Sequence, residues 1–399
     1  MGVKQRAAWR AAVVLVAAVA TSGVLVGSTR ALGAAPHAIA GVVRADPIAA
    51  ASADATWTTV FTGTMAGIEG LTGDDHGNLY VAERGGGSNP CPVWRIAAAT
   101  GAKAEVGFVP GPCAPSGLAF GPDGRLYITG ADGPALDDID VLTPGDATTE
   151  ATVFATGVAQ ANGVAFDRHG NLWATDGNNK KGIVYRVGPT GGAATEVFRV
   201  PPMANSVGVG RQDATLQGAA PNTPNPQDIV ANGIAFAHDG SIIVADTARG
   251  ALWRVNVDIK GNVASPVGCD ETYTADTLCL TDVFLESPSI EGADGIALDE
   301  AGRVWVDANE RQAIVVVDTG GRPTEFFRDP VQATTGRRNA GPLETPTSPV
   351  FLGRSLCTTS SDGNRRDNFP NSGGDVTGTG KISCLDQPID VPGAPLPVR

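Results

Sequence analysis

The chain has only 4 histidines, no Cys-x-x-Cys pair and no Gly-x-Ser-x-Gly motif. Without Gly-x-Ser-x-Gly it lacks the sharp turn that presents the serine nucleophile in many hydrolases. Without Cys-x-x-Cys a zinc site built from cysteines is disfavoured. The segment 378–381 is not a phosphate-binding loop, because Asp375 replaces its first Gly and Ile382 replaces its Ser or Thr.

Basic residues are also scarce, with 29 Lys and Arg against 42 Asp and Glu, for a net charge of −13. A chain this acidic is repelled by phosphate backbones and by anionic lipid headgroups, which argues against nucleic acid and membrane surfaces as partners. Acidity is compatible with cation binding but does not establish it. A small molecule is therefore the expected partner.

Long hydrophobic runs are missing apart from one near the N-terminus. Lys4, Arg6 and Arg10 precede an apolar stretch of 16 residues over 11–26, and small residues follow it. The stretch is shorter than the roughly 20 residues needed to cross a bilayer. This layout predicts a signal peptide over 1–40, no stable membrane span after its removal, and a secreted or periplasmic-type protein. A retained membrane anchor is the alternative.

The six cysteines agree with an oxidising compartment. They fall into local pairs that would tie insertions between strands, although six cysteines allow fifteen arrangements. The candidate disulfides are Cys91 with Cys113, Cys269 with Cys279, and Cys357 with Cys384.

The most informative feature that is present is one pattern repeated five times. Each copy has a polar residue, a Gly, a short apolar run, a Gly-containing turn and a second apolar run. The polar residues are Glu69, Ser116, Asn162, Asn232 and Asp294, separated by 47, 46, 70 and 62 residues. A degenerate sixth copy begins at Ser348. The longer separations indicate insertions in two repeats.

Each repeat is predicted to form four short strands. Two further runs rich in aromatic and β-branched residues follow the first two, as at 184–187 and 196–198. No helical periodicity of useful length follows residue 30. Four-stranded repeats of about 40–50 residues are typical of a β-propeller. We therefore predict an all-β, six-bladed propeller with four antiparallel strands per blade, over 56–385, as one domain although the length alone suggests two or three.

The ends of the propeller follow from the same pattern. A fourth-strand signature at Trp57–Phe61 precedes the first repeat. It is predicted to complete the last blade and so remove an exposed sheet edge. Residues 41–55 are expected to be a flexible leader, and the Pro-rich tail over 386–399 is expected to be unstructured. The polar stretch 201–228 is expected to be a loop near the active face.

The polar residue of each repeat is the candidate functional position. If the run after it is the innermost strand, these residues meet at one mouth of the central channel. Hard divalent cations take oxygen ligands. We predict metal ligands, most favourably for Ca²⁺ with Zn²⁺ or Mn²⁺ as alternatives, at Glu69, Asn162, Asn232 and Asp294, and substrate contacts at Asn162, Ser116 and Ser348. The alternative interpretation is that Asn-Gly and Asp-Gly are ordinary turn dipeptides, although Glu69-Gly70 is not a favoured one.

These residues resemble the regucalcin and gluconolactonase family, the senescence-marker-protein-like six-bladed propellers, over roughly 57–360. The chain looks like a secreted, bacterial-type member. The family's Glu-Gly-Pro, Pro-Asn-Gly-Leu and Pro-Asp-Gly ligand motifs are matched by Glu69-Gly70-Leu71, Ala231-Asn232-Gly233-Ile234 and Ala293-Asp294-Gly295. The run 245–247 also fits. The family's Arg-x-Asn-Asp-Gly is replaced by Ala159-Gln160-Ala161-Asn162-Gly163, so the Arg that contacts a sugar lactone is absent.

The resemblance implies a metal-dependent hydrolase that acts on a small cyclic ester. Asp294 is then the general base, or a ligand without base function, and Glu69 anchors the metal. A histidine base is not expected, because His76, His169 and His238 all fall in the turn after the first strand of a repeat. The alternative is a non-catalytic propeller, similar to NHL-repeat modules, that holds a structural calcium and binds a protein or a glycan.

Overall fold

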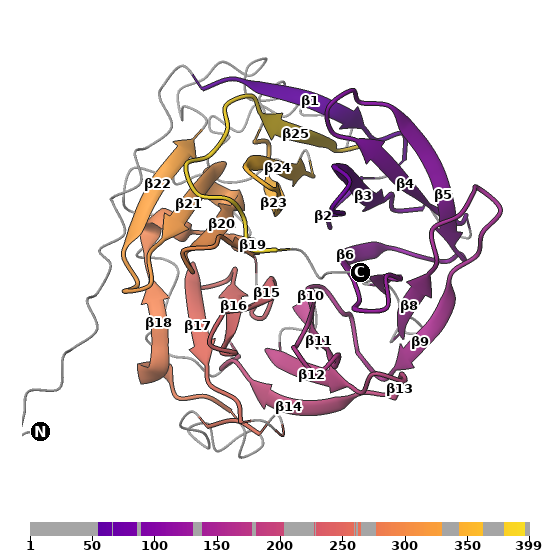
Figure 1. Ribbon diagram of the computed structural model, residues 1–399. Helices are drawn as coiled ribbons and strands as arrows, with labels where there is room; N and C mark the ends of the chain where they lie inside the picture. Colours follow the sequence, from indigo (N-terminus) through magenta and orange to yellow (C-terminus); the bar gives the residue numbers. More distant parts are fainter. Residues whose placement is uncertain are drawn as a thin grey trace, which may run out of the picture. The chain divides into compact units, whose positions relative to one another are not determined.

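The computed structural model describes residues 55–395, except 66, 86–88, 131–137, 178–180, 203–226, 228, 259, 261, 265–276, 329–342 and 362–378. The predicted signal peptide, most of the leader, most of the 201–228 loop and Cys269 lie outside the described residues. Within them, no helix has the length and apolarity of a membrane span. The strands form six antiparallel sheets around a central axis (Figure 1), which confirms the six-bladed propeller.

Each blade contains four strands, and the first strand of each is innermost. Blade 1 has β2 (Thr72–Gly73), β3 (Asn78–Ala82), β4 (Cys91–Ala97) and β5 (Lys103–Val109); blade 2 has β6 (Pro115–Phe120), β7 (Leu126–Gly130), β8 (Asp138–Leu142) and β9 (Thr152–Thr156). Blade 3 has β10 (Val164–Phe166), β11 (Leu172–Thr175), β12 (Ile183–Val187) and β14 (Thr195–Arg199), and its β13 (Gly192–Ala193) pairs with β9. Blade 4 has β15 (Ile234–Phe236), β16 (Ile242–Asp246), β17 (Ala251–Val255) and β18 (Val283–Glu286); blade 5 has β19 (Ala293–Leu298), β20 (Val304–Ala308), β21 (Ala313–Val317) and β22 (Pro323–Arg328).

Blade 6 combines both ends of the propeller. It has β23 (Pro346–Leu352), β24 (Ser355–Ser360) and β25 (Lys381–Leu385), and its outer strand is β1 (Trp57–Thr62). β1 pairs antiparallel with β25, with Thr58 opposite Cys384. The predicted closure by the N-terminal strand is therefore confirmed. It covers the edge of β25, whose unpaired backbone groups would otherwise be exposed.

Two of the three candidate disulfides are present. Cys357 and Cys384 lie opposite each other on β24 and β25 and are bonded, with a Cα–Cα distance of 4.0 Å. Cys91 is bonded to Cys113 across 22 residues. Cys279 is also disulfide-bonded, while its expected partner lies outside the described residues. Disulfides of this kind are more typical of extracellular proteins.

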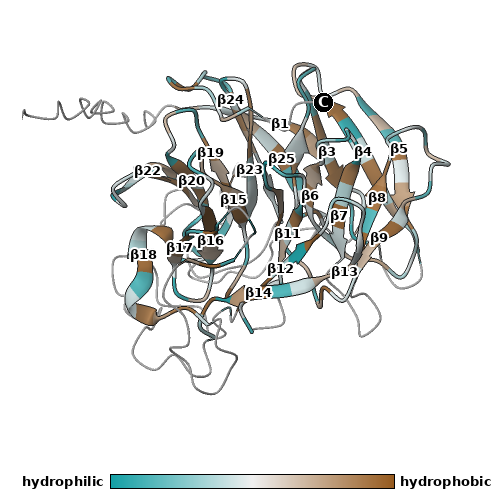
Figure 2. Ribbon diagram, turned by 60° about the horizontal axis from the view of Figure 1, so that its bottom comes forward, coloured by the Kyte–Doolittle hydropathy of each residue, from teal (hydrophilic) through white to brown (hydrophobic). Residues whose placement is uncertain are grey.

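Aromatic side chains join neighbouring blades. The fully buried Trp173 of blade 3 packs edge-on against Phe236 of blade 4, with ring centroids 5.9 Å apart. Trp305 of blade 5 contacts Phe351 of blade 6 in the same way at 5.2 Å. Edge-on aromatic pairs add about 0.5–1.5 kcal/mol each beyond the area they bury. Figure 2 shows the hydrophobic residues concentrated in strands such as β16 and β17.

An aspartate organises the turn between the first two strands of several blades. Asp167 accepts hydrogen bonds from the amides of His169 and Asn171 and from the indole N–H of Trp173. Burial acts to raise the pKa of Asp167, but the hydrogen bonds from Trp173 and Asn171 hold it below its ordinary value. His169 lies in this turn, as predicted, and His76 and His238 lie in the matching turns of blades 1 and 4.

The C-terminal segment is ordered over 386–395, so the prediction of an unstructured tail is wrong there. The amide of Ile389 donates to the carbonyl of Arg354, and the amide of Ala394 donates to that of Leu298. The side chain of Ile389 is buried. Composition misled the prediction because a Pro-rich segment has few N–H groups to satisfy, and carbonyls of blades 5 and 6 accept from those it has.

Candidate functional site

The predicted positions meet in one cavity on the propeller axis. Its volume is about 70 Å³, and its lining includes Glu69, Ser116, Asn162, Asn232, Asp294, Thr347 and Ser348. The structure thus brings together every residue that the repeat pattern singled out. A cavity needs about 10–15 Å³ to hold a water, so this one can hold an ion with a few waters. A larger molecule has to sit at its mouth.

The glycine that follows the polar residue in the first five repeats allows the inner strands of neighbouring blades to approach one another. A Cβ added to Gly233 would lie 2.4 Å from the main-chain oxygen of Asp294, and one added to Gly163 would lie 2.4 Å from that of Asn232. The same holds for Gly70, Gly117 and Gly295 at 1.9–2.2 Å. None of the five has a positive φ. The turn-dipeptide interpretation is therefore wrong, because these glycines serve close packing of the inner strands.

The sixth position of the ring differs by one residue from the prediction. The oxygen that faces Gly295 belongs to Thr347, at 2.2 Å from the added Cβ, while Ser348 takes the place that glycine has elsewhere. Both residues line the cavity. The prediction missed this shift because the sixth copy lacks the glycine that marks the position in the other five copies.

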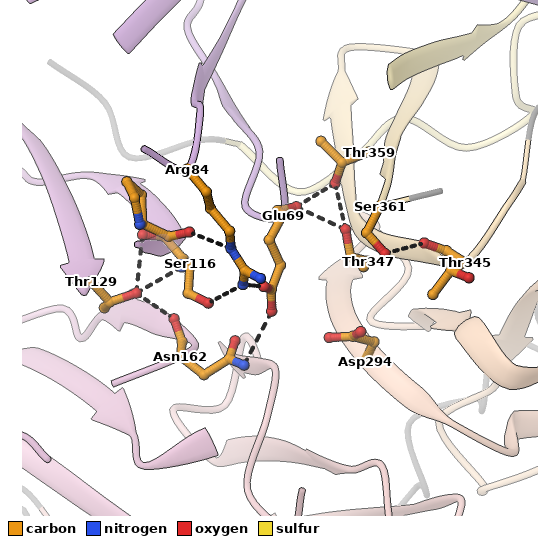
Figure 3. Close-up of polar contacts among 12 residues, drawn as sticks. Glu69, Arg84, Ser116, Thr129, Asn162, Asp294, Thr345, Thr347, Thr359 and Ser361 are labelled. Atoms are coloured by element: carbon orange, nitrogen blue, oxygen red, sulfur yellow. Dashed lines mark hydrogen bonds and ion pairs between the residues drawn. The ribbon is translucent and has the colours of Figure 1, made fainter. Parts of the chain in front are cut away.

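Threonine hydroxyls anchor the backbone of the ring. Thr129 Oγ1 in blade 2 donates to the carbonyl of Asn162 in blade 3 at 2.6 Å. Thr347 Oγ1 and Thr359 Oγ1, both in blade 6, donate to the carbonyl of Glu69 before blade 1. Figure 3 shows both arrangements around the axis. Because the carbonyls are held from neighbouring blades, the side chains of Asn162 and Glu69 are directed towards the cavity.

Glu69 is the centre of a charged cluster that the sequence did not reveal. Its Oε1 accepts a hydrogen bond of 3.2 Å from Asn162 Nδ2, and its Oε2 forms an ion pair with Arg84. Arg84 also donates from Nη2 to Ser116 Oγ and from Nε to the carbonyl of Pro115, both at 3.3 Å. Figure 3 shows the guanidinium between Glu69 and Ser116. The ring therefore includes a positively charged side chain, the guanidinium of Arg84.

Asp294 is held from behind by a second polar network. Its Oδ2 accepts a hydrogen bond of 2.7 Å from Asn309 Nδ2. Asn309 in turn accepts one of 2.9 Å from Gln227, which also donates to Glu310. Asp294 is 5% exposed, and its carboxylate points into the ring in Figure 3. The hydrogen bond from Asn309 therefore holds the Asp294 carboxylate in one orientation towards the cavity.

The side-chain oxygen of Asn232, and not its nitrogen, is available to the cavity. Its Nδ2 donates to Thr247 Oγ1 at 2.9 Å, which leaves Oδ1 as the atom that can serve a cation. Thr247 in turn donates to the carbonyl of Ala293, at 2.6 Å. In blade 3, the fully buried Asp176 follows the end of β11, and burial raises the pKa of its carboxyl group to about 7.

The donor set suits a hard divalent cation. Two carboxylates and two amides, from Glu69, Asp294, Asn162 and Asn232, supply about four oxygens, where calcium takes 6–8. Water and substrate oxygens complete such a shell. Soft metals prefer sulfur ligands and copper prefers imidazoles, and among the described residues that line the cavity there is neither Cys nor His.

Arg84, Thr247 and Asn309 share a position to which sequence reasoning gave no role, although the run 245–247 was noted. Each follows the end of the second strand of its blade, after β3, β16 and β20 respectively. The sequence has a different polar residue at this position in these three repeats, whereas Gly177 occupies it in blade 3. A comparison of the repeats there would have indicated all three.

Comparison with known proteins identifies the family to which the chain is similar. The sequence profile of the SMP-30/gluconolactonase/LRE-like region matches residues 141–358, more than half of the chain. A calcium-binding protein, regucalcin, from Agrobacterium tumefaciens is 20% identical over 88% of this chain and 97% of that one, with a TM-score of 0.54. A gluconolactonase from Xanthomonas campestris is 15% identical over 85% and 91%, with a TM-score of 0.52.

A luciferin-regenerating enzyme is 16% identical over 86% of this chain and 99% of that one, with a TM-score of 0.55. At these identities the solved structures establish the fold alone. No curated protein matches the chain significantly. The matched profile, the six blades and the polar ring around the axis agree, and the chain belongs to the SMP-30/gluconolactonase/LRE-like family.

Proposed function

We propose that this protein is a divalent-metal-dependent hydrolase that opens a small cyclic ester at the mouth of its central channel. The observation that carries the proposal is the convergence of Glu69, Asn162, Asn232 and Asp294 on one small cavity. Membership of a family that includes gluconolactonases supports a lactone as the substrate class. The similarity to regucalcin, a calcium-binding protein, supports Ca²⁺ as the cation.

The four ring residues would hold the cation. When bound, the cation polarises the ester carbonyl and stabilises the negative charge that develops on its oxygen. Asp294 accepts the proton of the attacking water, with its Oδ2 held by Asn309 so that the carboxylate keeps one orientation. The water oxygen bonds to the carbonyl carbon, the ring C–O bond breaks, and the proton passes to the leaving oxygen. The product is the open hydroxy acid.

Substrate orientation is assigned to the uncharged side chains of the ring. Ser116, Ser348 and Asn162 all line the cavity and offer hydroxyl and amide groups to a bound ester. Because the cavity is small, these groups contact the reacting end of the substrate and leave the remainder outside. The size of the rest of the substrate is then set by the residues at the mouth.

The test is hydrolysis of a panel of lactones and aryl esters with Ca²⁺, Zn²⁺ and Mn²⁺ added separately to chelator-treated protein. Asp294→Asn keeps the shape of the side chain and its acceptor for Asn309, and we expect kcat to fall at least about 100-fold. Asp239→Asn is the matched control. Its carboxylate lies in the turn at the far end of blade 4, where it pairs with Arg254, and its activity should match the wild type.

Three outcomes of this test are decisive. Turnover that requires the metal and disappears only in Asp294→Asn supports the proposal. Full activity after chelation would refute the role of the metal. Tight metal binding without turnover on any substrate would favour the alternative, an NHL-like binding propeller with a structural ion.

A further inference from the structure

The structure assigns a competitive role to Arg84: we infer that its guanidinium and a divalent cation compete for Glu69, so that Arg84 sets the metal affinity of the ring. The inference rests on the proposed function, because it takes the ring as the metal site. Both oxygens of Glu69 have partners, Oε1 in Asn162 and Oε2 in Arg84. A cation that takes Glu69 as a ligand therefore has to share the carboxylate with the guanidinium or displace it.

The geometry lets Arg84 move away without disturbing the fold. Its backbone is fixed in blade 1, where the amide donates to the carbonyl of Gly67 at 2.8 Å. Its guanidinium has two further acceptors on blade 2, Ser116 Oγ and the carbonyl of Pro115. The side chain is 32% exposed, against 13% for Glu69. Displacement therefore means a side-chain rotation at the rim of the cavity.

The charges show why the competition is strong. Glu69 and Asp294 bring two negative charges to the ring, and Arg84 offsets one of them. Oxygen-ligand sites tune calcium affinity through the number of charged ligands. A guanidinium about 5 Å from a divalent ion is repelled strongly enough to weaken binding about tenfold even at the dielectric constant of water. At the partly buried Glu69 the effect is larger.

Arg84 has opposite effects on the two forms of the ring. Without metal it stabilises the Glu69 carboxylate, and with metal it opposes the bound charge. Removing it should therefore lower the melting temperature of the chelated protein and raise the calcium affinity at the same time. A purely structural ion pair would lower the melting temperature and leave the affinity unchanged or reduced.

The experiment is calorimetric titration of the chelator-treated full chain with CaCl₂, together with thermal unfolding in chelator and in excess calcium. The variants are Arg84→Gln, Arg84→Met, which keeps the aliphatic stem if the first folds poorly, and Arg84→Lys, which keeps the charge. The matched control is Arg125→Gln. Arg125 pairs with Asp123 at 2.6 Å in the turn at the far end of blade 2, so its loss changes the net charge equally.

We expect the neutral Arg84 variants to bind Ca²⁺ at least tenfold more tightly than the wild type. Arg84→Lys should stay near the wild type, and Arg125→Gln should change less than twofold. Equal or weaker binding by the neutral variants, with normal binding by the wild type, would overturn the inference and leave the proposed function intact. If neither the wild type nor any Arg84 variant binds Ca²⁺, Zn²⁺ or Mn²⁺, both the inference and the metal-dependent function fail.

Discussion

Gly233→Ala tests whether the ring depends on close approach of the inner strands. The added Cβ would lie 2.4 Å from the carbonyl oxygen of Asp294, 2.9 Å from Gly295 Cα and 3.0 Å from the amide nitrogen of Ile296. All three are backbone atoms of β19, so no side chain can rotate to make room. The two blades have to separate at the point where the amide of Gly233 donates to that carbonyl at 3.2 Å.

The size of the effect follows from these contacts. Overpacking costs typically about 1–3 kcal/mol, and a weakened buried hydrogen bond adds about 1 kcal/mol. We therefore expect urea denaturation to show a loss of about 2–4 kcal/mol in the free energy of unfolding. Because Asn232 and Asp294 are pushed apart, calcium affinity measured by calorimetry should also fall at least tenfold.

Gly188→Ala is the matched control for this prediction. Gly188 follows β12, and a Cβ there meets no atom within 4 Å. Its φ is not positive, so the free energy of unfolding should change by less than about 1 kcal/mol. If Gly233→Ala were as stable as Gly188→Ala, the packing argument would be refuted. A loss of only about 1 kcal/mol would instead indicate the conformational preference of a turn glycine.

Three further predictions follow from the same contacts. Burial raises the pKa of Asp176 from 3.8 to about 7; the folded state therefore keeps a proton that the unfolded chain releases, and the stability present below pH 3.8 is lost as the pH rises to about 7. Asp176→Asn should remove this loss, so that urea denaturation finds the variant up to about 4 kcal/mol more stable than the wild type at pH 8 and similar at pH 4; equal stability at both values would contradict the assignment. Asn309→Ala removes the donor to the buried Asp294 carboxylate and should lower kcat for lactone hydrolysis at least about tenfold, with about 1–3 kcal/mol of lost stability; an unchanged kcat would rule out its role in positioning the base. Replacing Cys357 and Cys384 by Ser opens a 27-residue link and should lower the free energy of unfolding by about 3.5 kcal/mol, and denaturation midpoints equal to those of the oxidised wild type would count against it.

The repeat pattern predicted the blades because their chemistry is local. Asp167, Asn171 and Trp173 are close in sequence and form their turn without help from another blade. The same units recur at regular spacing, so the number of blades and the innermost strand of each follow by counting. Pseudo-symmetry then brings Glu69 and Asp294 to the axis, although 225 residues separate them (294 − 69).

Contacts between blades could not be predicted in this way. The reach of Arg84 to Ser116 and of Asn162 to Glu69 depends on how far apart the blades lie, and no local pattern contains that distance. The one-residue shift from Ser348 to Thr347 became visible only from packing, because the carbonyl oxygen of Thr347 is the one that faces Gly295. The docking of the tail over 386–395 depends on the carbonyls of Leu298 and Arg354, which are far away in the sequence.

The sequence by itself determined which side chains stand at the axis, because the repeat places each of them at or just before the start of the innermost strand of its blade. The tertiary structure alone decided how groups of different blades meet, because Asn162 of blade 3 reaches Glu69, and Arg84 of blade 1 reaches Ser116 of blade 2, only after the ring has closed. Oxygen ligands can be identified from their spacing in the chain. The affinity with which they hold an ion depends on distances between groups that the fold brings together.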